Sequence, residues 1–572
     1  MSMLRLVSAA LLFAHSLFMT ANGQDMWCGK PYQKGSPPVT IPPESMFPVP
    51  PTSSLPLLDF SCNPAVQPYI SGEDELATFL LDAEITSTVG QPFSGIVGET
   101  SLQVELVHGQ SIFATAVIEA GRRGVEVNVP LATYFAPSSQ GYQIQCVAKV
   151  QGASTYNSST VLKYLPPNQN GSVIKLDLRT GTLLTKPKGS TEYQPIVPYG
   201  FYTSFSDYLA LNLSVVNEIK AQGFNVIHPI PPFGSNELRD AVFDRMEEVG
   251  MYLIYDMRND YQNLTAVREQ VESVKGRANL LLWYTADEPD GWGFPHNSTT
   301  IASGLIRSID PYHPISLVLN CYDYYFKEYV GDAEIVLQDT YPIGINATHS
   351  IVWDTNCTST YGDCGCDDCL PGAGLRDIAR RQDVFLERAQ LMGRRRSLTV
   401  WDVPQGFGEE TYWPRYPTGK EFVAEVAISL LHGATGVTSW NMPTTAEITS
   451  AASQLALEAW PQITQFVSDK ISVFTLTKSD GDTVEAGLWY TANTSRSSAL
   501  LIIVNVGEME DSVSLALPYA ADGGWNKIFQ SGSTATLSAS QTNSNATATV
   551  DGFGVAVFVH DEKRDGMPLL VD

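Results

Sequence analysis

The sequence predicts an α/β protein built on a central (β/α)8 TIM barrel, with one β-sandwich domain before the barrel and another after it. Length is the first reason, because 572 residues exceed the roughly 250–300 that one hydrophobic core supports. The second is a middle region where short apolar runs alternate with amphipathic segments of helical period. The third is a period-two alternation of apolar and polar residues in both flanking regions, which is typical of antiparallel sheets.

Composition excludes several classes of protein. The chain has 61 acidic and 35 basic residues, a net charge of −26, and 44 Gly with 35 Pro. A strongly negative surface repels phosphate backbones and anionic lipids, so we expect neither nucleic acid nor a membrane as a partner. The many turn residues exclude coiled-coil and collagen-like folds and favour β-structure.

The N-terminus predicts a signal peptide over residues 1–23. Arg5 precedes an apolar run over 6–19, and small residues follow at 21–23. About 14 apolar residues are too few to cross a bilayer, which needs about 20. We therefore expect a secreted, extracellular protein. Nine Asn-x-Ser/Thr acceptors indicate a glycoprotein: Asn157, Asn170, Asn212, Asn263, Asn297, Asn346, Asn356, Asn493 and Asn545.

The cysteines form an even set, which predicts disulfides in an oxidising compartment. A pair between Cys62 and Cys146 could join the sheets of the first β-domain, and Cys28 could tie down the N-terminal arm. Zinc is the alternative for the cluster over 357–369, where aspartates are interleaved, but no histidine lies nearby. The eight residues are Cys28, Cys62, Cys146, Cys321, Cys357, Cys364, Cys366 and Cys369.

Four regions follow the signal peptide. Residues 24–58 are rich in Pro and Ser and predict an extended arm. Residues 59–167 show short alternating runs and predict the N-terminal β-sandwich, residues 168–468 the barrel, and residues 469–572 the C-terminal β-sandwich. For both sandwiches we expect support of the barrel, with sugar binding as the alternative.

Eight strand-then-helix units run through the barrel region. Each strand is nearly all apolar and therefore covered on both faces, which fits a closed parallel barrel. The segment after the fifth strand is the shortest of the connections, so it leaves the fewest residues for a helix. The predicted strands are 196–201, 224–228, 251–256, 280–284, 315–320, 334–338, 398–401 and 436–440. The predicted helices are 207–222, 237–249, 265–275, 300–309, 375–391, 420–432 and 452–467.

The end of the fourth strand carries the sharpest chemical signal. Asp287 and Glu288 directly follow a buried strand, and Pro289 ends any further ladder pairing. In barrels of this class the reacting groups project from the C-terminal ends of the strands. An adjacent acidic pair elsewhere would be a solvated surface feature, but this position favours catalysis.

A resemblance to a known class rests on four runs: LLLWYTADEPDGW, IVLQDTYPIG, VWDVPQGFG and LLHGATGVTSWNMP. They resemble clan-A-like (β/α)8 glycoside hydrolases, in which a Glu-Pro dipeptide after strand four carries the general acid/base and sandwich domains often flank the barrel. The similarity covers roughly 195–445 and identifies no single family. Asp287 stands where that class usually has Asn. The resemblance also implies a nucleophilic Glu at strand seven.

Glycoside cleavage needs two carboxyl groups, one protonated and one ionised. Glu288 is the predicted acid, because an aromatic, partly dry setting and neighbouring anions raise its pKa. For its partner, Asp339 follows strand six directly, whereas Glu409 and Glu410 lie further into the loop after strand seven; these candidates rank nearly equal, ahead of Asp402. A wide gap from Asp339 would indicate inversion, and a closer Glu would indicate retention.

Other residues at strand ends predict sugar contacts, because aromatic faces stack on pyranoses and polar groups orient hydroxyls. Barrel packing is the alternative for each aromatic residue, and a structural role is the alternative for His228. The predicted substrate-binding residues are Asp287, His228, Asp256, Arg258, Trp283, Asn320, Tyr341, Trp401, Gln405 and Trp440.

The sequence contains no Walker loop, dinucleotide-binding glycine motif, zinc-protease motif or nucleophile elbow, so we expect no cofactor and no metal. The leading hypothesis is a secreted glycoside hydrolase that acts on an oligo- or polysaccharide of the extracellular space or cell wall. The alternatives are a non-catalytic carbohydrate-binding protein on a degenerate barrel and a wall-remodelling transglycosylase.

Overall fold

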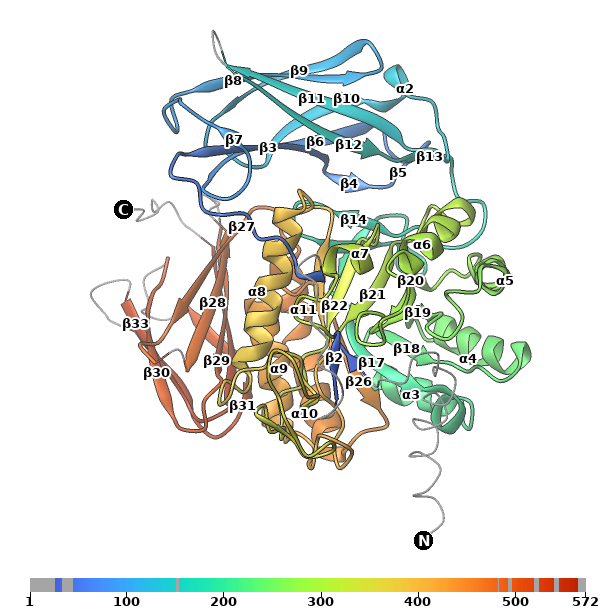
Figure 1. Ribbon diagram of the computed structural model, residues 1–572, viewed down its shortest axis with the longest axis vertical. Helices are drawn as coiled ribbons and strands as arrows, with labels where there is room; N and C mark the ends of the chain where they lie inside the picture. The colour runs from blue at the N-terminus through green and yellow to red at the C-terminus, as the bar shows by residue number, and fades with distance from the viewer. Residues whose placement is uncertain are drawn as a thin grey trace.

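The computed structural model describes residues 26–32, 45–150, 154–481, 483–491, 496–518, 524–539 and 545–563. The predicted signal peptide and the acceptor Asn493 lie outside these residues. The molecule has three parts: N-terminal sheets over one end of the barrel, the central barrel with its helices, and C-terminal sheets against one side of the barrel (Figure 1).

The N-terminal region is a pair of four-stranded antiparallel sheets, with strand orders β10-β6-β3-β7 and β12-β11-β8-β9. Along β3, buried and half-buried residues alternate strictly, so one face of the strand supplies the core between the sheets. A disulfide between Cys62 and Cys146 links the two sheets. The strands are β3 (Leu57–Pro64), β6 (Leu76–Thr86), β7 (Gln91–Pro92), β8 (Ser101–His108), β9 (Ser111–Glu119), β10 (Val125–Pro130), β11 (Tyr142–Val150) and β12 (Thr155–Leu162).

A small sheet covers the base of the barrel. It has the order β16-β15-β14-β4, made by β4 (Val66–Gln67), β14 (Lys175–Asp177), β15 (Thr182–Thr185) and β16 (Gln194–Ile196). Leu176 and Leu183 of this sheet share one apolar cluster with Val226 and Leu282 inside the barrel. The base is therefore filled, which leaves the opposite, C-terminal end of the strands as the open mouth.

Eight parallel strands close into the predicted barrel, in sequential order. All eight strands predicted from the sequence are present, with ends shifted by a few residues. They are β17 (Tyr199–Ser204), β18 (Val226–Ile230), β19 (Tyr252–Asp256), β20 (Leu280–Asp287), β21 (Ile315–Leu319), β22 (Ile335–Gln338), β25 (Thr399–Asp402) and β26 (Val437–Met442).

The helices pack on the outer face of the strands and bury their apolar sides there. They are α3 (Ser214–Ala221), α4 (Asn236–Glu248), α5 (Leu264–Val274), α6 (Ser298–Ile309), α7 (Phe326–Val330), α8 (Arg376–Leu391), α9 (Gly419–Leu431), α10 (Ala446–Glu458) and α11 (Trp460–Val467). Among the described residues, no helix is both long and apolar enough to span a membrane.

Two predicted helices are each divided in the structure. The segment 207–222 consists of a π-helical turn, η2 (Phe205–Leu209), and then α3, whose first residue Ser214 donates its backbone N–H to the Asn212 side chain at 3.0 Å. The segment 452–467 is divided between α10 and α11, because Pro461 in the first turn of α11 has no N–H to continue the preceding helix.

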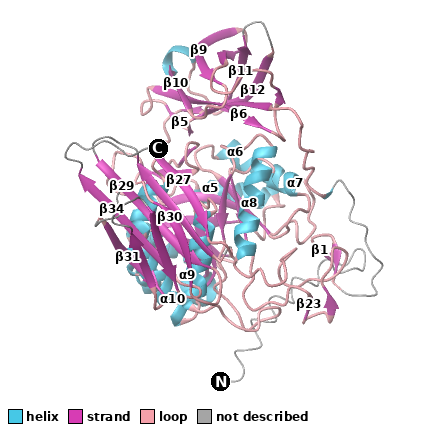
Figure 2. Cartoon of the chain, turned by 90° about the vertical axis from the view of Figure 1, so that its left-hand side faces the viewer, coloured by secondary structure: helices cyan, strands magenta, loops and turns pink. Residues whose placement is uncertain are grey.

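The C-terminal region is a five-stranded sheet of order β27-β28-β29-β34-β31 facing a three-stranded sheet of order β30-β33-β32. Trp489, Leu500 and Ile502 of the larger sheet join the outer core of the barrel, so this region packs directly on the barrel helices (Figure 2). The strands are β27 (Ser472–Lys478), β28 (Val484–Thr491), β29 (Arg496–Asn505), β30 (Asp511–Ala516), β31 (Trp525–Ser531), β32 (Ala535–Ala539), β33 (Asn545–Val550) and β34 (Val555–Lys563).

Candidate active site

Two carboxyl groups meet at the C-terminal end of the barrel. Glu288 directly follows β20, Asp339 directly follows β22, and their side chains are hydrogen-bonded to each other. Asp339 is 3% exposed, whereas Glu288 is only half-buried. Glu288 has a φ of 48°, in the left-handed region that non-glycine residues seldom occupy. Backbone strain of this kind is concentrated at functional sites, so this pair is the first candidate for chemistry.

The surroundings place a shared proton on Glu288. Burial raises the pKa of Glu288 well above its ordinary value, and the negative charge of Asp339 raises it further. Burial also raises the pKa of Asp339, but the hydrogen bond from Glu288 opposes that effect, as do the Arg381 guanidinium and the Asn320 amide, whose nitrogen is 3.1 Å away. The pair therefore combines a protonated acid with a carboxylate.

Asp287 is held apart from this pair by two donors. Its Oδ2 accepts from Arg258 Nη1 at 2.8 Å, and its Oδ1 accepts from the Tyr284 hydroxyl at 2.6 Å. Arg258 also donates through Nε to Asp256 at 2.7 Å. Both oxygens of Asp287 are thereby occupied, which leaves Glu288 as the carboxyl of the dipeptide that faces Asp339.

His228 supports the wall of the site from within. Its ring is completely buried, lies 2.9 Å from Asp256 through Nε2, and stacks on Tyr202 with 3.8 Å between ring centroids. Burial lowers the pKa of His228 to about 4, so the imidazole is neutral at physiological pH. With no exposed surface, the ring cannot contact a substrate in this conformation, and its contacts are those of a structural histidine.

Aromatic rings border the acid pair. Trp440 is half-buried, and its ring lies 5.0 Å from the Arg258 guanidinium carbon. Tyr341 is 7% exposed, and its pKa is raised first by burial and then by the charges of Asp339 and Glu288. Two apolar rings face Tyr341 edge-on, Phe407 at 4.9 Å and Trp413 at 6.0 Å between centroids. An aromatic border around a few convergent polar groups is typical of a ligand site.

Three predicted substrate contacts are instead part of the protein interior. Trp283 lies on the outer face of β20, fully buried among helices, and donates its indole N–H to Asp310 at 2.8 Å. Trp401 fills the inside of the barrel and has no exposed surface. Gln405 is also fully buried, with its amide nitrogen bonded to the backbone oxygens of Ile343 and Phe407. None of these three side chains reaches the mouth. The two tryptophans are packed in the apolar interior, and the glutamine amide is hydrogen-bonded to backbone groups.

The candidates after strand seven also lie elsewhere. Glu409 and Glu410 are exposed on their loop, and no hydrogen bond or ion pair joins either to Glu288 in the described part of the chain. Asp402 points outward from β25 toward Glu425 of α9, where both carboxyls are sealed from solvent and burial raises both pKa values, that of Asp402 to about 8. Among the candidate partners, Asp339 is the one that the structure joins to Glu288 by a hydrogen bond.

Several residues at the site were not predicted from the sequence. Tyr202 and Tyr284 line the inner wall, and Trp27 of the N-terminal arm contacts Asn320. Arg381 from α8 donates to the backbone oxygens of Asn320 and Asp367 and acts on Asp339 through its charge. The alternation of strand residues would have indicated Tyr284, since it is the neighbour of the outward-facing Trp283. Trp27 and Arg381 enter from distant segments, and no local pattern marks them.

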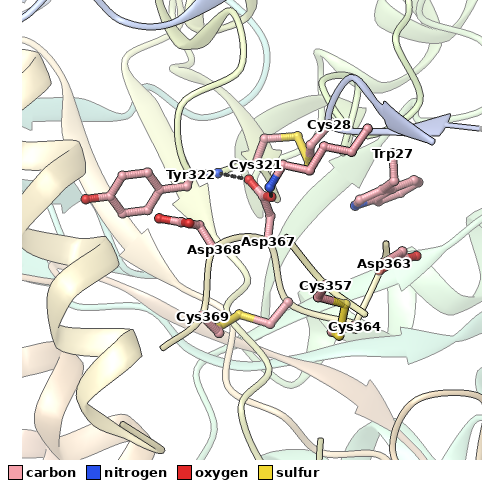
Figure 3. Close-up of polar contacts among 12 residues, drawn as sticks. Trp27, Cys28, Cys321, Tyr322, Cys357, Asp363, Cys364, Asp367, Asp368 and Cys369 are labelled. Atoms are coloured by element: carbon pink, nitrogen blue, oxygen red, sulfur yellow. Dashed lines mark hydrogen bonds and ion pairs between the residues drawn. A yellow bond between two sulfur atoms is a disulfide. The ribbon is translucent and has the colours of Figure 1, made fainter. Parts of the chain in front are cut away.

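The eight cysteines form four disulfides, which confirms the predicted oxidation of the 357–369 cluster. The pairs are Cys28–Cys321, Cys62–Cys146, Cys357–Cys364 and Cys366–Cys369. Cys28, Cys321 and Asp367 lie close enough to suit a metal ion. Their chemistry does not, since the two sulfurs are bonded to each other and Asp367 forms an ion pair with Lys30 at 2.6 Å (Figure 3).

No family model matches this sequence, and no curated protein matches it either. Solved structures with a similar chain path include a putative alpha-galactosidase from Bacteroides fragilis, with 10% identity and a TM-score of 0.40, covering 90% of this chain and 99% of that one. Another is the catalytic domain of GH30 xylanase C from Talaromyces cellulolyticus, with 11% identity, a TM-score of 0.35, and coverage of 66% and 98%. A glucosidase from Croceicoccus marinus has 10% identity, a TM-score of 0.36, and coverage of 62% and 92%. These neighbours are glycoside hydrolases, but similarity this low assigns neither a family nor a substrate.

Proposed function

We propose that the protein is a secreted, retaining glycoside hydrolase, with Glu288 as the acid/base and Asp339 as the nucleophile. The observation that carries the proposal is the hydrogen-bonded carboxyl pair at the mouth of the barrel, in which Glu288 holds the proton and Asp339 is ionised. Glycoside cleavage needs these two forms on facing carboxyl groups. Four disulfides support the secreted location.

The separation of the pair favours retention over inversion. Retaining enzymes hold their carboxyls about 5–5.5 Å apart, whereas inverting enzymes keep about 6.5–9.5 Å to admit a water molecule. Side chains in hydrogen-bond contact are nearer to the first arrangement. The carboxylate of Asp339 then attacks the anomeric carbon while Glu288 protonates the leaving oxygen. In the second step Glu288 removes a proton from water, which attacks the same carbon and releases Asp339.

The residues around the pair supply the sugar contacts in this proposal. Trp440 offers a half-buried aromatic ring, Tyr341 a hydroxyl whose pKa responds to the charges of both acids, and Asp287 a carboxylate oriented by Arg258. The substrate is an oligo- or polysaccharide, and the two β-domains, residues 59–167 and 469–572, support the barrel. The chemistry of the pair requires no cofactor.

The test is a substrate panel read by proton NMR. The full chain is incubated with aryl glycosides and with polysaccharides, and the anomeric signal of the first-formed product is compared with that of the substrate. We expect hydrolysis with the same anomeric configuration. An inverted product would exclude Asp339 as the nucleophile, binding without turnover would favour a carbohydrate-binding protein, and lengthened chains would favour a transglycosylase.

A further inference from the structure

The described part of the N-terminal arm, residues 26–32, lies against the loops that surround the acid pair. Cys28 is bonded to Cys321 in the loop after β21, and Lys30 forms an ion pair with Asp367 at 2.6 Å in the loop after β22 (Figure 3). The backbone oxygen of Pro31 accepts from the Gly362 N–H at 2.9 Å. The Tyr32 ring of the arm stacks on Trp353 in the same loop, with 4.8 Å between ring centroids. Covalent and polar contacts thus fix the arm at the mouth.

Trp27 of this arm contacts two loops beside the Glu288–Asp339 pair, the loop after β20 and the loop after β21. A Cβ at Gly291 would lie 2.4 Å from the Trp27 ring, so the indole packs directly on the turn that follows Glu288. On its other side, the indole Nε1 donates to Asn320 Oδ1 at 2.9 Å. Asp290 also links these two loops, since it accepts from the backbone N–H groups of Cys321 at 2.8 Å and Asn320 at 3.3 Å.

The chemistry of the indole sets the orientation of the Asn320 amide. An indole N–H is a donor only, so it must face the amide oxygen of Asn320. The amide NH2 group is then directed the other way, where Nδ2 donates to Asp339 Oδ1 at 3.1 Å. If the amide turned over, its oxygen would face the carboxylate of Asp339 and repel it.

We propose that Trp27 is a positioning residue of the active site: by holding the Asn320 amide it keeps a hydrogen-bond donor on the nucleophile Asp339. Cys28 directly follows Trp27, Cys321 directly follows Asn320, and the two cysteines are joined by a disulfide. This bond holds Trp27 and Asn320 close to each other at the site. The expected effect on turnover rests on the proposed function, in which Asp339 is the nucleophile. The hydrogen-bond path from Trp27 to Asp339 can be tested without turnover.

Other charges act on Asp339 as well, and a pH experiment must hold them constant. They come from the last residue of β20 and the loop after it, from α8, from β25 and from the loop of Asp339 itself. The groups are Glu288, Asp287, Asp290, Arg381, Asp402 and Tyr341. The substitutions below alter none of them.

The decisive variant is Trp27→Phe, which keeps an aromatic ring on Gly291 but removes the donor. Loss of the donated hydrogen bond makes ionisation of Asp339 harder, so the acidic limb of the pH dependence of kcat/KM should move up by about one pH unit. We expect kcat to fall about tenfold with little change in KM, since the substrate contacts are unchanged. Trp292→Phe is the matched control, because it removes an indole N–H from the same turn and keeps an aromatic ring against Trp27, whose centroid lies 5.1 Å from that of Trp292. Its profile should equal that of the native protein.

A double-mutant cycle with Asn320→Ala separates this path from general loosening of the arm. Asn320→Ala should shift the limb in the same direction, and adding Trp27→Phe to it should produce no further shift. Additive effects, or an unshifted Asn320→Ala profile, would overturn the proposal. Melting temperatures identify misfolded variants, and an unshifted Asn320→Ala profile overturns the proposal even if Trp27→Phe does not fold.

A spectroscopic readout keeps the inference separate from the proposed function. Difference infrared spectroscopy follows the protonated carboxyl band during a pH titration, and Asp339→Asn identifies the contribution of Asp339. A shifted Asp339 titration in Trp27→Phe, but not in Trp292→Phe, would support the positioning role even in a protein that hydrolyses no glycoside. Identical titrations in all three proteins would refute it even if hydrolysis is confirmed.

Discussion

Two pairs of acidic side chains occur in the same barrel, and they differ in access to solvent. Glu288 and Asp339 lie at the open mouth, where Glu288 is half-exposed and Asp339 accepts from Asn320. Asp402 and Glu425 face each other between β25 and α9, with exposed fractions of 1% and 0%. Burial is the largest cause of the raised pKa values in both pairs.

Under the proposed function, a raised pKa alone does not distinguish the catalytic pair from the sealed one. In the sealed pair, burial outweighs the groups that favour ionisation, which are the Ser429 hydroxyl at Asp402 and the Gln405 N–H and Arg415 charge at Glu425. Glu425 Oε1 has no hydrogen-bond partner among the described residues. In the open pair, Asn320 and Arg381 favour ionisation of Asp339 while Glu288 keeps its proton. Reactivity requires this asymmetry together with access, because a substrate must meet one acid and one base.

The largest effect should come from Asp339→Asn. An amide cannot attack the anomeric carbon, so we expect kcat/KM to fall at least about 10⁴-fold, as nucleophile removal does in enzymes with covalent intermediates. The loss should be the same for good and poor leaving groups, which steady-state rates on a series of aryl glycosides will measure. Equal activity of this variant and the native protein on any substrate would remove Asp339 from the mechanism.

Glu288→Gln should have the next largest effect, and its size should depend on the leaving group. General acid catalysis contributes about 10²–10⁴-fold, so we expect about a thousandfold loss on a substrate whose leaving group needs a proton. An activated aryl glycoside should be cleaved with a much smaller loss in its first step. Gln resembles the protonated form of Glu288, so the melting temperature should be unchanged; near-normal rates on the poor substrate would contradict the assignment.

Asp402→Asn should have the smallest effect on turnover, less than about twofold, and a measurable effect on stability. Burial raises the pKa of Asp402 from 3.8 in the unfolded chain to about 8 in the folded protein. The folded state therefore binds a proton that the unfolded chain releases, and stability falls as pH rises through this window, by up to about 1.4 kcal/mol per pH unit. Asn removes that dependence.

The measurement for Asp402→Asn is thermal unfolding from about pH 5 to about pH 8, a range inside this window. We expect the melting temperature of the variant to exceed that of the native protein, by an amount that grows toward the higher pH. A large loss of activity with unchanged stability would mean that the sealed pair takes part in the chemistry, and would break the contrast between the two pairs.

The sequence predicted the closed barrel because each strand is a short apolar run followed by an amphipathic helix. It also predicted Glu288 and Asp339 as candidates, because both directly follow such runs. The prediction for Trp283 was wrong by one residue, since side chains alternate between the two faces of a strand and Tyr284 is the inward neighbour. The same alternation accounts for Asp402, whose neighbour Trp401 points inward.

What the sequence could not predict depends on contacts between distant segments. The orientation of the Asn320 amide depends on Trp27, which is far away in the sequence. The protonation of the acid pair depends on Arg381 from α8 and on the spatial approach of two strand ends. Spacing and composition describe neighbours along the chain, whereas these contacts arise only after the barrel has closed.

The Cys28–Cys321 disulfide also sets an order of events during biosynthesis. Its partners are separated by 293 residues, so at about 5–20 residues per second the ribosome needs roughly 15–60 s after Cys28 to deliver Cys321. Cys62 and Cys146 are made within that interval and join each other over a separation of 84 residues. Wrong pairing with Cys28 is the hazard of this delay, and a thiol isomerase is the catalyst that would correct it. The mouth of the barrel is thus among the last parts of the chain to reach its covalent form.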